Sequence, residues 1–348
     1  MREGIVMESN TIDESNKFDF RKDAKYTGMV DFCNVNMPIF NWSGCSVQVN
    51  FKGTDIDVKL LNINSSKDNW INIFIDKEEP QIINLLPNIN TYSIAKGLKN
   101  EKHTIEIYKR TEAFTGQIQF LGFGLPKGGK FLPPPPTSLR KIEIIGDSIT
   151  SAAGNEEVYS EEDMEFKPKY ENSYMSYAAI SARILSAHLN IISASGSGCY
   201  QNYGGEKENT LGDLYLNTNP SESYDKWNIQ KWKPDVVVVN LGTNDFSFEI
   251  DKNQFMEKYK RLINHIRNKY SEAIIFCAIG PMNLIPGKYI NKVVKELNNE
   301  GDINIYYLEF EAQNGNEDGL GWGGHPSIKT HEKMAIILAE EIKNKLNW

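Results

Sequence analysis

Cysteine is scarce in this chain and the few that occur are scattered. The 348 residues include four, Cys33, Cys45, Cys199 and Cys277, with no Cys-x-x-Cys pair and no Cys/His cluster among them. Structural zinc sites need such clusters, so we expect no bound metal and free thiols.

Excess positive charge and long hydrophobic runs are also missing. The 38 Lys and Arg residues against 46 Asp and Glu residues give a net charge of −8. Proteins that bind nucleic acids or anionic membranes rely on basic residues, so neither partner is expected. The longest apolar stretches, 236–239 and 273–279, fall far short of the roughly 20 residues that span a bilayer.

The first 17 residues contain no basic stretch followed by an apolar one, the pattern of a secretory signal peptide. From this we expect a cytoplasmic protein, or a secreted one if a signal has been removed.

Residues 27–125 read as a β-rich unit. Apolar and polar residues alternate there, and this alternation predicts strands over 46–51, 56–60, 70–75, 104–108 and 117–121. Many short strands without a convincing amphipathic helix predict a β-sandwich of the jelly-roll type. The four prolines Pro133–Pro136 cannot donate ladder hydrogen bonds and indicate a boundary. We therefore divide the chain into a β-sandwich domain (1–132), a linker (133–137) and a second domain (138–348).

The second domain has a different pattern. Continuous Val/Ile-rich strands are expected at 141–145, 235–240, 273–279 and 303–310, another strand starts at 191–192, and helices are expected at 171–187 and 327–346. Such strands alternating with helices predict an α/β fold with a parallel sheet covered on both faces. Because chemistry in these sheets sits at the carboxyl ends of the strands, residues 146–148, 195–198 and 242–245 should share one crevice.

Ser148 is the candidate nucleophile, directly after the first strand of this domain. It does not lie in a Gly-x-Ser-x-Gly elbow, and alone it would be read as a helix cap. Gly198 and Asn244 could donate a backbone and a side-chain N–H to an oxyanion, and His325 lies in a glycine-rich loop before the last helix. For Gly198 or Asn244 alone, a turn would be the simpler interpretation.

Together, in this order and after expected strands, these four residues resemble the four-block signature of the SGNH (GDSL-type) hydrolases. The resemblance continues to carbohydrate esterase family 2 through residues 41–44, 51–54, 154–156, 171–174 and 195–198. It covers residues 20–348. It implies an SGNH-type α/β/α domain behind a jelly roll, and removal of O-acetyl groups from plant-polysaccharide sugars such as xylan, mannan and glucosides.

The resemblance also assigns roles. It implies Ser148 as nucleophile, His325 as base, and the Ser148 N–H, Gly198 N–H and Asn244 amide as oxyanion hole, with no metal or organic cofactor. Most SGNH hydrolases place an Asp three residues before the His, and some family 2 members two before, whereas here these positions hold Trp322 and Gly323. Some members lack the acid, so we expect a Ser148–His325 dyad oriented by a loop carbonyl.

Other residues could contact the sugar. Trp322 beside the base could stack on a ring or pack under the loop, and Tyr200 and Asn202 could line the site or fill a polar loop. His331 is expected to be solvated. Two other functions stay open, an SGNH lipase or lysophospholipase and a non-catalytic carbohydrate-binding protein. Edge strands of the sandwich would permit a homo-oligomer.

Overall fold

A computed structural model describes residues 17–63, 68–163, 165–215 and 232–348. The chain divides into two compact units, Met1–Thr137 and Ser138–Trp348. Each unit is described by itself.

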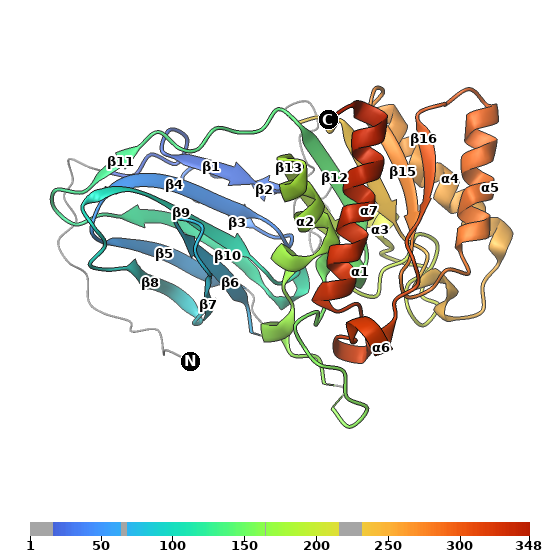
Figure 1. Cartoon of the computed structure of the whole chain (residues 1–348), viewed down its shortest axis with the longest axis horizontal. Helices are drawn as coiled ribbons and strands as arrows, with labels where there is room; N and C mark the ends of the chain where they lie inside the picture. The colour runs from blue at the N-terminus through green and yellow to red at the C-terminus, as the bar shows by residue number, and fades with distance from the viewer. Residues whose placement is uncertain (1–16, 64–67, 164, 216–231) are drawn as a thin grey trace. The chain divides into compact units, whose positions relative to one another are not determined.

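The described part of the first unit consists of two antiparallel sheets (Figure 1). One sheet has the order β1-β4-β9-β6-β7 with β11 also paired to β4, and the other has the order β2-β3-β10-β5-β8. The strands of the first sheet are β1 (Ala24–Thr27), β4 (Ser46–Gly53), β6 (Trp70–Ile75), β7 (Gln81–Asn84), β9 (Glu101–Lys109) and β11 (Lys130–Leu132). Those of the second are β2 (Val30–Asp31), β3 (Ile39–Phe40), β5 (Ile56–Ile63), β8 (Asn88–Ala95) and β10 (Gln117–Gly124).

Alternation along the strands explains the buried layer of this unit. Val47 and Val49 of β4 lie opposite Ile107 and Ile105 of β9, and all four side chains are fully buried. Phe120 of β10 adds an aromatic cluster, with edge-to-face contacts to phenylalanines such as Phe18 at 5.6 Å between ring centroids. The predicted β-sandwich is confirmed.

The described part of the second unit is built on a five-stranded parallel sheet with the order β13-β12-β14-β15-β16. Its strands are β12 (Lys141–Gly146), β13 (His188–Ser193), β14 (Val236–Asn240), β15 (Ile274–Ile279) and β16 (Ile305–Glu309). Its longer helices are α2 (Tyr177–Ile184), α4 (Lys252–Lys269), α5 (Gly287–Asn299) and α7 (Ile328–Leu346).

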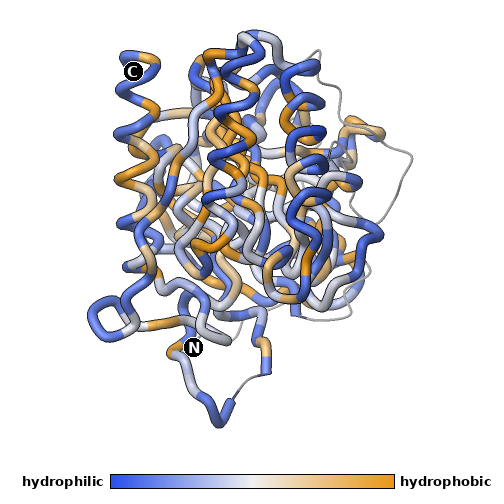
Figure 2. Tube along the Cα trace, turned by 90° about the vertical axis from the view of Figure 1, so that its right-hand side faces the viewer, coloured by the Kyte–Doolittle hydropathy of each residue, from blue (hydrophilic) through white to orange (hydrophobic). Residues whose placement is uncertain are grey.

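Helices cover both faces of this sheet. On one face, Ile144 and Val238 pack in a core cluster with residues of α2 and α7. On the other face, the Tyr259 hydroxyl of α4 reaches the Val239 carbonyl at 3.4 Å. Figure 2 shows this layering: the strands in the interior are hydrophobic, and the helices that surround them alternate between hydrophobic and hydrophilic residues. The predicted α/β fold is confirmed.

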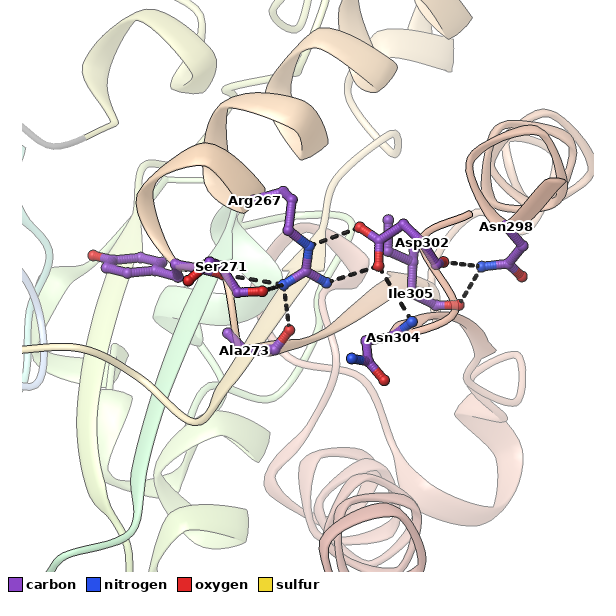
Figure 3. Close-up of polar contacts among 8 residues, drawn as sticks. Arg267, Ser271, Ala273, Asn298, Asp302, Asn304 and Ile305 are labelled. Atoms are coloured by element: carbon purple, nitrogen blue, oxygen red, sulfur yellow. Dashed lines mark hydrogen bonds and ion pairs between the residues drawn. The ribbon is translucent and has the colours of Figure 1, made fainter. Parts of the chain in front are cut away.

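Arg267, near the end of α4, links that helix to the loop before β16 (Figure 3). Its guanidinium donates to both carboxylate oxygens of Asp302, at 2.7 and 3.1 Å, and to the carbonyls of Tyr270, Ser271 and Ala273. This cluster lies at the amino ends of β15 and β16. The loops that carry the candidate site lie at the opposite, carboxyl ends of the strands. None of the helices in the described ranges combines the length and apolar character needed to cross a membrane.

Candidate active site

Ser148 lies where β12 turns into the short helix α1 (Ser148–Ser151). Asp147 caps this helix, because its Oδ1 accepts a hydrogen bond from the Ile149 N–H at 3.0 Å. Gly146 makes the tight turn possible, since a Cβ there would lie 2.0 Å from the Thr150 hydroxyl. The turn therefore places the Ser148 hydroxyl at the first residue of a helix, at the carboxyl edge of the sheet.

The imidazole of His325 is held between Ser148 and a main-chain carbonyl. Its Nε2 lies 2.9 Å from the Ser148 Oγ, and its Nδ1 lies 2.8 Å from the Trp322 carbonyl oxygen. A carbonyl can only accept, so Nδ1 carries the proton and Nε2 accepts from the serine hydroxyl. Burial lowers the pKa of His325, and the bond to the Trp322 carbonyl partly opposes this. The ring is therefore a neutral base at pH 7.

Glycines shape the loop that presents His325. Gly323 and Gly324 have φ angles of 56° and 78°, which L-residues rarely adopt. The Trp322 N–H donates to the Gly154 carbonyl at 3.1 Å, and a Cβ at Gly154 would lie 2.2 Å from the Trp322 Cβ. The Trp322 ring stacks on the His325 ring with centroids 5.2 Å apart. Trp322 thus restrains the base through both its carbonyl and its ring.

In the described part of the chain, the His325 ring nitrogens bond to the Trp322 carbonyl and the Ser148 hydroxyl, and neither bonds to a carboxylate. Asp318, the nearest upstream Asp, instead forms ion pairs with Lys329 and Lys333 at 3.1 and 2.6 Å. Their hydrogen bonds and charges lower the pKa of Asp318. The orienting group of the imidazole is the Trp322 carbonyl.

Both expected oxyanion donors beyond Ser148 are engaged in the resting structure. The Asn244 Nδ2 donates to the Asp147 Oδ2 at 3.1 Å and to the Ser197 carbonyl at 3.0 Å. The Gly198 N–H donates to the Asn202 Oδ1 at 3.1 Å. Asn244 thus lies beside the turn of the nucleophile, whereas the Gly198 donor is held within its own loop.

Asp245 organises that loop, a role that sequence reasoning missed. Its buried carboxylate accepts from the N–H groups of Cys199, Tyr200 and Gln201 at 2.9, 2.6 and 3.0 Å. Burial raises the pKa of Asp245 and these three bonds oppose the rise. A Cβ at Gly198 would lie 1.9 Å from the Gln201 carbonyl, so the loop needs glycine there. In the sequence, the position of Asp245 directly after Asn244 was the signal that could have revealed this role.

The three expected sugar contacts differ in their placement. Trp322 is half-buried beside the base. Tyr200 is buried and its hydroxyl donates to the Gln254 side-chain oxygen at 2.9 Å. Both polar atoms of the Asn202 amide are bonded: its Oδ1 accepts the Gly198 N–H at 3.1 Å, and its Nδ2 donates to the Glu208 carbonyl at 2.9 Å.

The expectation of a solvated His331 is wrong. His331 lies on the inner face of α7 and is fully buried. Its Nδ1 accepts the Tyr177 N–H at 3.2 Å and its ring stacks on Tyr177 at 6.2 Å. Burial lowers the pKa of His331 to about 3. Within the described ranges, no group of three His, Cys, Asp or Glu residues could hold a metal ion.

Two family models match the chain. Carbohydrate esterase 2 N-terminal matches residues 26–135, and GDSL-like Lipase/Acylhydrolase matches residues 142–338.

Individual relatives agree with this match. The chain is 43% identical over 347 residues to the cellulase/esterase CelE of Acetivibrio thermocellus, covering 98% of this chain but only 41% of that protein. It is 25% identical over 317 residues to an acetylxylan esterase / glucomannan deacetylase of Cellvibrio japonicus, covering 89% of this chain and 85% of that one.

A solved structure extends the likeness to both units. A family two carbohydrate esterase from Clostridium thermocellum in complex with cellohexaose is 42% identical, with a TM-score of 0.88, covering 93% of this chain and 99% of that one. The chain therefore belongs to carbohydrate esterase family 2, a family of carboxylic ester hydrolases with a GDSL-type domain.

Proposed function

We propose that this chain is a serine esterase that removes O-acetyl groups from sugars. The hydrogen bond of 2.9 Å from the Ser148 hydroxyl to the His325 Nε2 carries the proposal, because a serine paired with an oriented neutral base is an activated nucleophile. The Trp322 carbonyl supplies the orientation at the other ring nitrogen.

In the first half-reaction, His325 takes the proton of Ser148 as the serine oxygen attacks the acetyl carbonyl. The tetrahedral oxyanion accepts hydrogen bonds from the Ser148 N–H, the Gly198 N–H and the Asn244 amide. His325 then protonates the departing sugar oxygen, leaving an acetyl ester on Ser148. Water, deprotonated by His325, hydrolyses that ester and restores the enzyme.

Two donors must change partner for this step. Asn244 can keep its bond to Asp147 while releasing the Ser197 carbonyl, because each bond uses a different amide hydrogen. Gly198 has a single N–H and must release the Asn202 oxygen. Formation of the oxyanion is thus coupled to a local rearrangement of the loop after β13.

The names of the relatives support acetylated polysaccharides and their oligosaccharides as substrates. They include a cellulase/esterase and an acetylxylan esterase / glucomannan deacetylase. We accordingly propose xylo-, manno- or gluco-configured sugars as the alcohol part of the ester. The reaction requires no cofactor, since serine and imidazole supply nucleophile and base.

The alternative functions have less support. The open cleft next to the Gly198 loop is lined mainly by polar residues and glycines, with Phe248 and Ile250 as its two apolar side chains, and so lacks the continuous apolar wall that a long acyl chain would need. A non-catalytic binding protein would have no need for the Ser148–His325 hydrogen bond.

The test is acetate release from acetylated xylo-, manno- and gluco-oligosaccharides by the wild type and by Ser148→Ala. We expect a loss of turnover on the order of 10⁴–10⁶-fold in the variant. Ser160→Ala, which removes a partly exposed loop hydroxyl, is the matched control. Preferred hydrolysis of a long-chain acyl ester would establish the lipase function instead. Sugar binding without turnover on any ester would establish the binding protein.

A further inference from the structure

An open cleft of about 600 Å³ lies between the loop 201–207 and the loop 248–251. Clefts of this size accommodate small-molecule ligands. The mechanism above uses none of the residues that line it.

The cleft continues the loops of the candidate active site. The loop 201–207 follows Gly198 along the chain, and the loop 248–251 follows Asn244. The side-chain Nε2 of Gln201 ties the two loops together, because it donates to the Asp245 carbonyl at 2.9 Å and to the Glu249 carbonyl at 3.1 Å. The cleft and the oxyanion donors therefore share one carboxyl edge of the sheet.

An exposed aromatic ring faces bare backbone in this cleft. Phe248 is 63% exposed, although a phenylalanine gains stability mainly by burial. Across from it, Gly204 and Gly205 have φ angles of 88° and 91°, and a Cβ at Gly205 would lie 3.4 Å from the Phe248 ring. Tyr203, next to these glycines, is 71% exposed. Glycine thus keeps the space beside the Phe248 ring clear of side chains.

Polar groups complete the rim. Lys207 and Glu249 are exposed, and the Lys207 ammonium lies 4.7 Å from the centre of the Tyr200 ring. Asp251 is committed to capping α4, since its carboxylate accepts from the N–H groups of Asn253 and Gln254. A flat apolar ring among polar side chains suits a ligand with one apolar face and several hydroxyl groups.

We propose that this cleft is a glycan subsite that binds a pyranose ring of the substrate chain next to the acetylated sugar, with the ring face of that pyranose on Phe248. Its hydroxyl groups meet Lys207 and Glu249 at the rim. The inference rests on the proposed function for the identity of the ligand as the substrate's own sugar chain. It assigns chain-length preference to the loops after Gly198 and Asn244.

The direct test is calorimetric binding of unacetylated xylotetraose, mannotetraose and cellotetraose to the full chain. Phe248→Ala should weaken binding of the preferred tetrasaccharide on the order of tenfold, because it removes an aromatic contact. Phe248→Trp keeps a ring and should bind within about threefold of the wild type. Ile303→Ala is the control, because it removes another exposed apolar side chain (74% exposed) in the loop before β16, at the amino end of the sheet. Its affinity for the tetrasaccharide should match that of the wild type.

The same variants separate this proposal from the proposed function. On acetylated substrates, Phe248→Ala should abolish the advantage in kcat/KM of a tetrasaccharide over a monosaccharide. Unchanged tetrasaccharide affinity in Phe248→Ala, or no binding of any of the three by the wild type, would overturn the subsite. Phe248-dependent binding in a chain without esterase activity would overturn the proposed function and leave the subsite standing.

Discussion

At the scale of single residues, the orientation of the base depends on a neutral carbonyl. The Trp322 oxygen accepts the Nδ1–H of His325, while Asp318 is paired with Lys329 and Lys333. A carbonyl fixes the tautomer but stabilises imidazolium less than a carboxylate does. Asp318→Asn should therefore change kcat for acetate release by no more than about threefold.

The control for this prediction is His325→Ala, in which turnover should fall by several orders of magnitude while the fold persists. A thousandfold loss of kcat in Asp318→Asn, with an unchanged circular dichroism spectrum, would show that the carboxylate serves the base after all.

In the proposed mechanism, Asn202 competes with the oxyanion for the Gly198 N–H. Its side-chain oxygen accepts that N–H at 3.1 Å in the resting structure. Asn202→Ala removes the acceptor and should raise kcat/KM by about 2- to 10-fold, the value of one ordinary hydrogen bond. Asn202→Asp should lower kcat/KM, because a carboxylate accepts more strongly and repels the oxyanion.

Asn316→Ala, at an exposed position of the short helix α6 (Gly315–Asp318), is the matched control and should behave as wild type. Equal kcat/KM for Asn202→Ala and wild type, at equal melting temperature, would contradict the role of the Gly198 N–H as a donor.

The sequence was informative about the residues for which we propose catalytic roles and poor on the residues that support them. Ser148 and His325 were found because they stand in a fixed order after predicted strands, and the structure brings them within 2.9 Å. Asp245 and His331 were missed, since their importance comes from burial among groups distant in sequence. His331 contacts Tyr177, which lies 154 residues away.

At the scale of elements, Arg267 fastens α4 to the loop before β16. Its planar guanidinium forms a bidentate pair with Asp302 and also donates to three carbonyls. A lysine ammonium cannot reproduce this set of bonds. Arg267→Lys should lower the free energy of unfolding by about 1–3 kcal/mol, measured by urea denaturation.

Lys260→Ala is the comparison, because the Lys260–Glu300 pair is more exposed and should contribute only about 0–1 kcal/mol. Equal effects of the two substitutions would mean that the carbonyl bonds of Arg267 add no stability.

The strongly patterned elements were predictable. The alternation of β4 and the continuous Val run of β14 correspond to strands in the structure. The helix expected over 171–187 is shorter, Tyr177–Ile184, because the Ser176 hydroxyl caps it by accepting the Ala179 N–H at 3.1 Å. β7 was missed, since its four residues are exposed or half-buried and show no alternation. Edge strands of this kind leave little trace in a sequence.

At the scale of the whole molecule, two buried groups give stability opposite dependences on pH. Burial raises the pKa of Glu143 in β12 to about 7 from 4.5, although the Tyr215 hydroxyl donates to it at 2.8 Å. The folded chain thus holds that proton more tightly, and stability is lost as the pH rises from 4.5 to 7. His331 has a pKa of about 3 in the folded chain against an ordinary value of 6.5. Its contribution to the stability of the fold is therefore lost as the pH falls from 6.5 to 3.

Between pH 4.5 and 6.5 these contributions oppose each other in the wild type. Glu143→Gln removes the contribution of Glu143. As the pH increases from 4.5 to 6.5, the free energy of unfolding of the variant should therefore rise relative to that of the wild type. Above pH 7 the variant should be more stable by up to about 3 kcal/mol, because it no longer buries a carboxylate. The measurement is urea denaturation at half-unit steps of pH, taken as the difference between variant and wild type.

Taking the difference cancels every group that titrates alike in both proteins, His331 included, and leaves Glu143. Glu340→Gln makes the same chemical change at an exposed position of α7 and is the matched control. A flat difference for Glu143→Gln would mean that Glu143 titrates alike in the folded and unfolded chain. The Tyr215 hydroxyl would then compensate fully for burial of the charge, and the pH dependence of folding would rest on His331 and the remaining carboxylates.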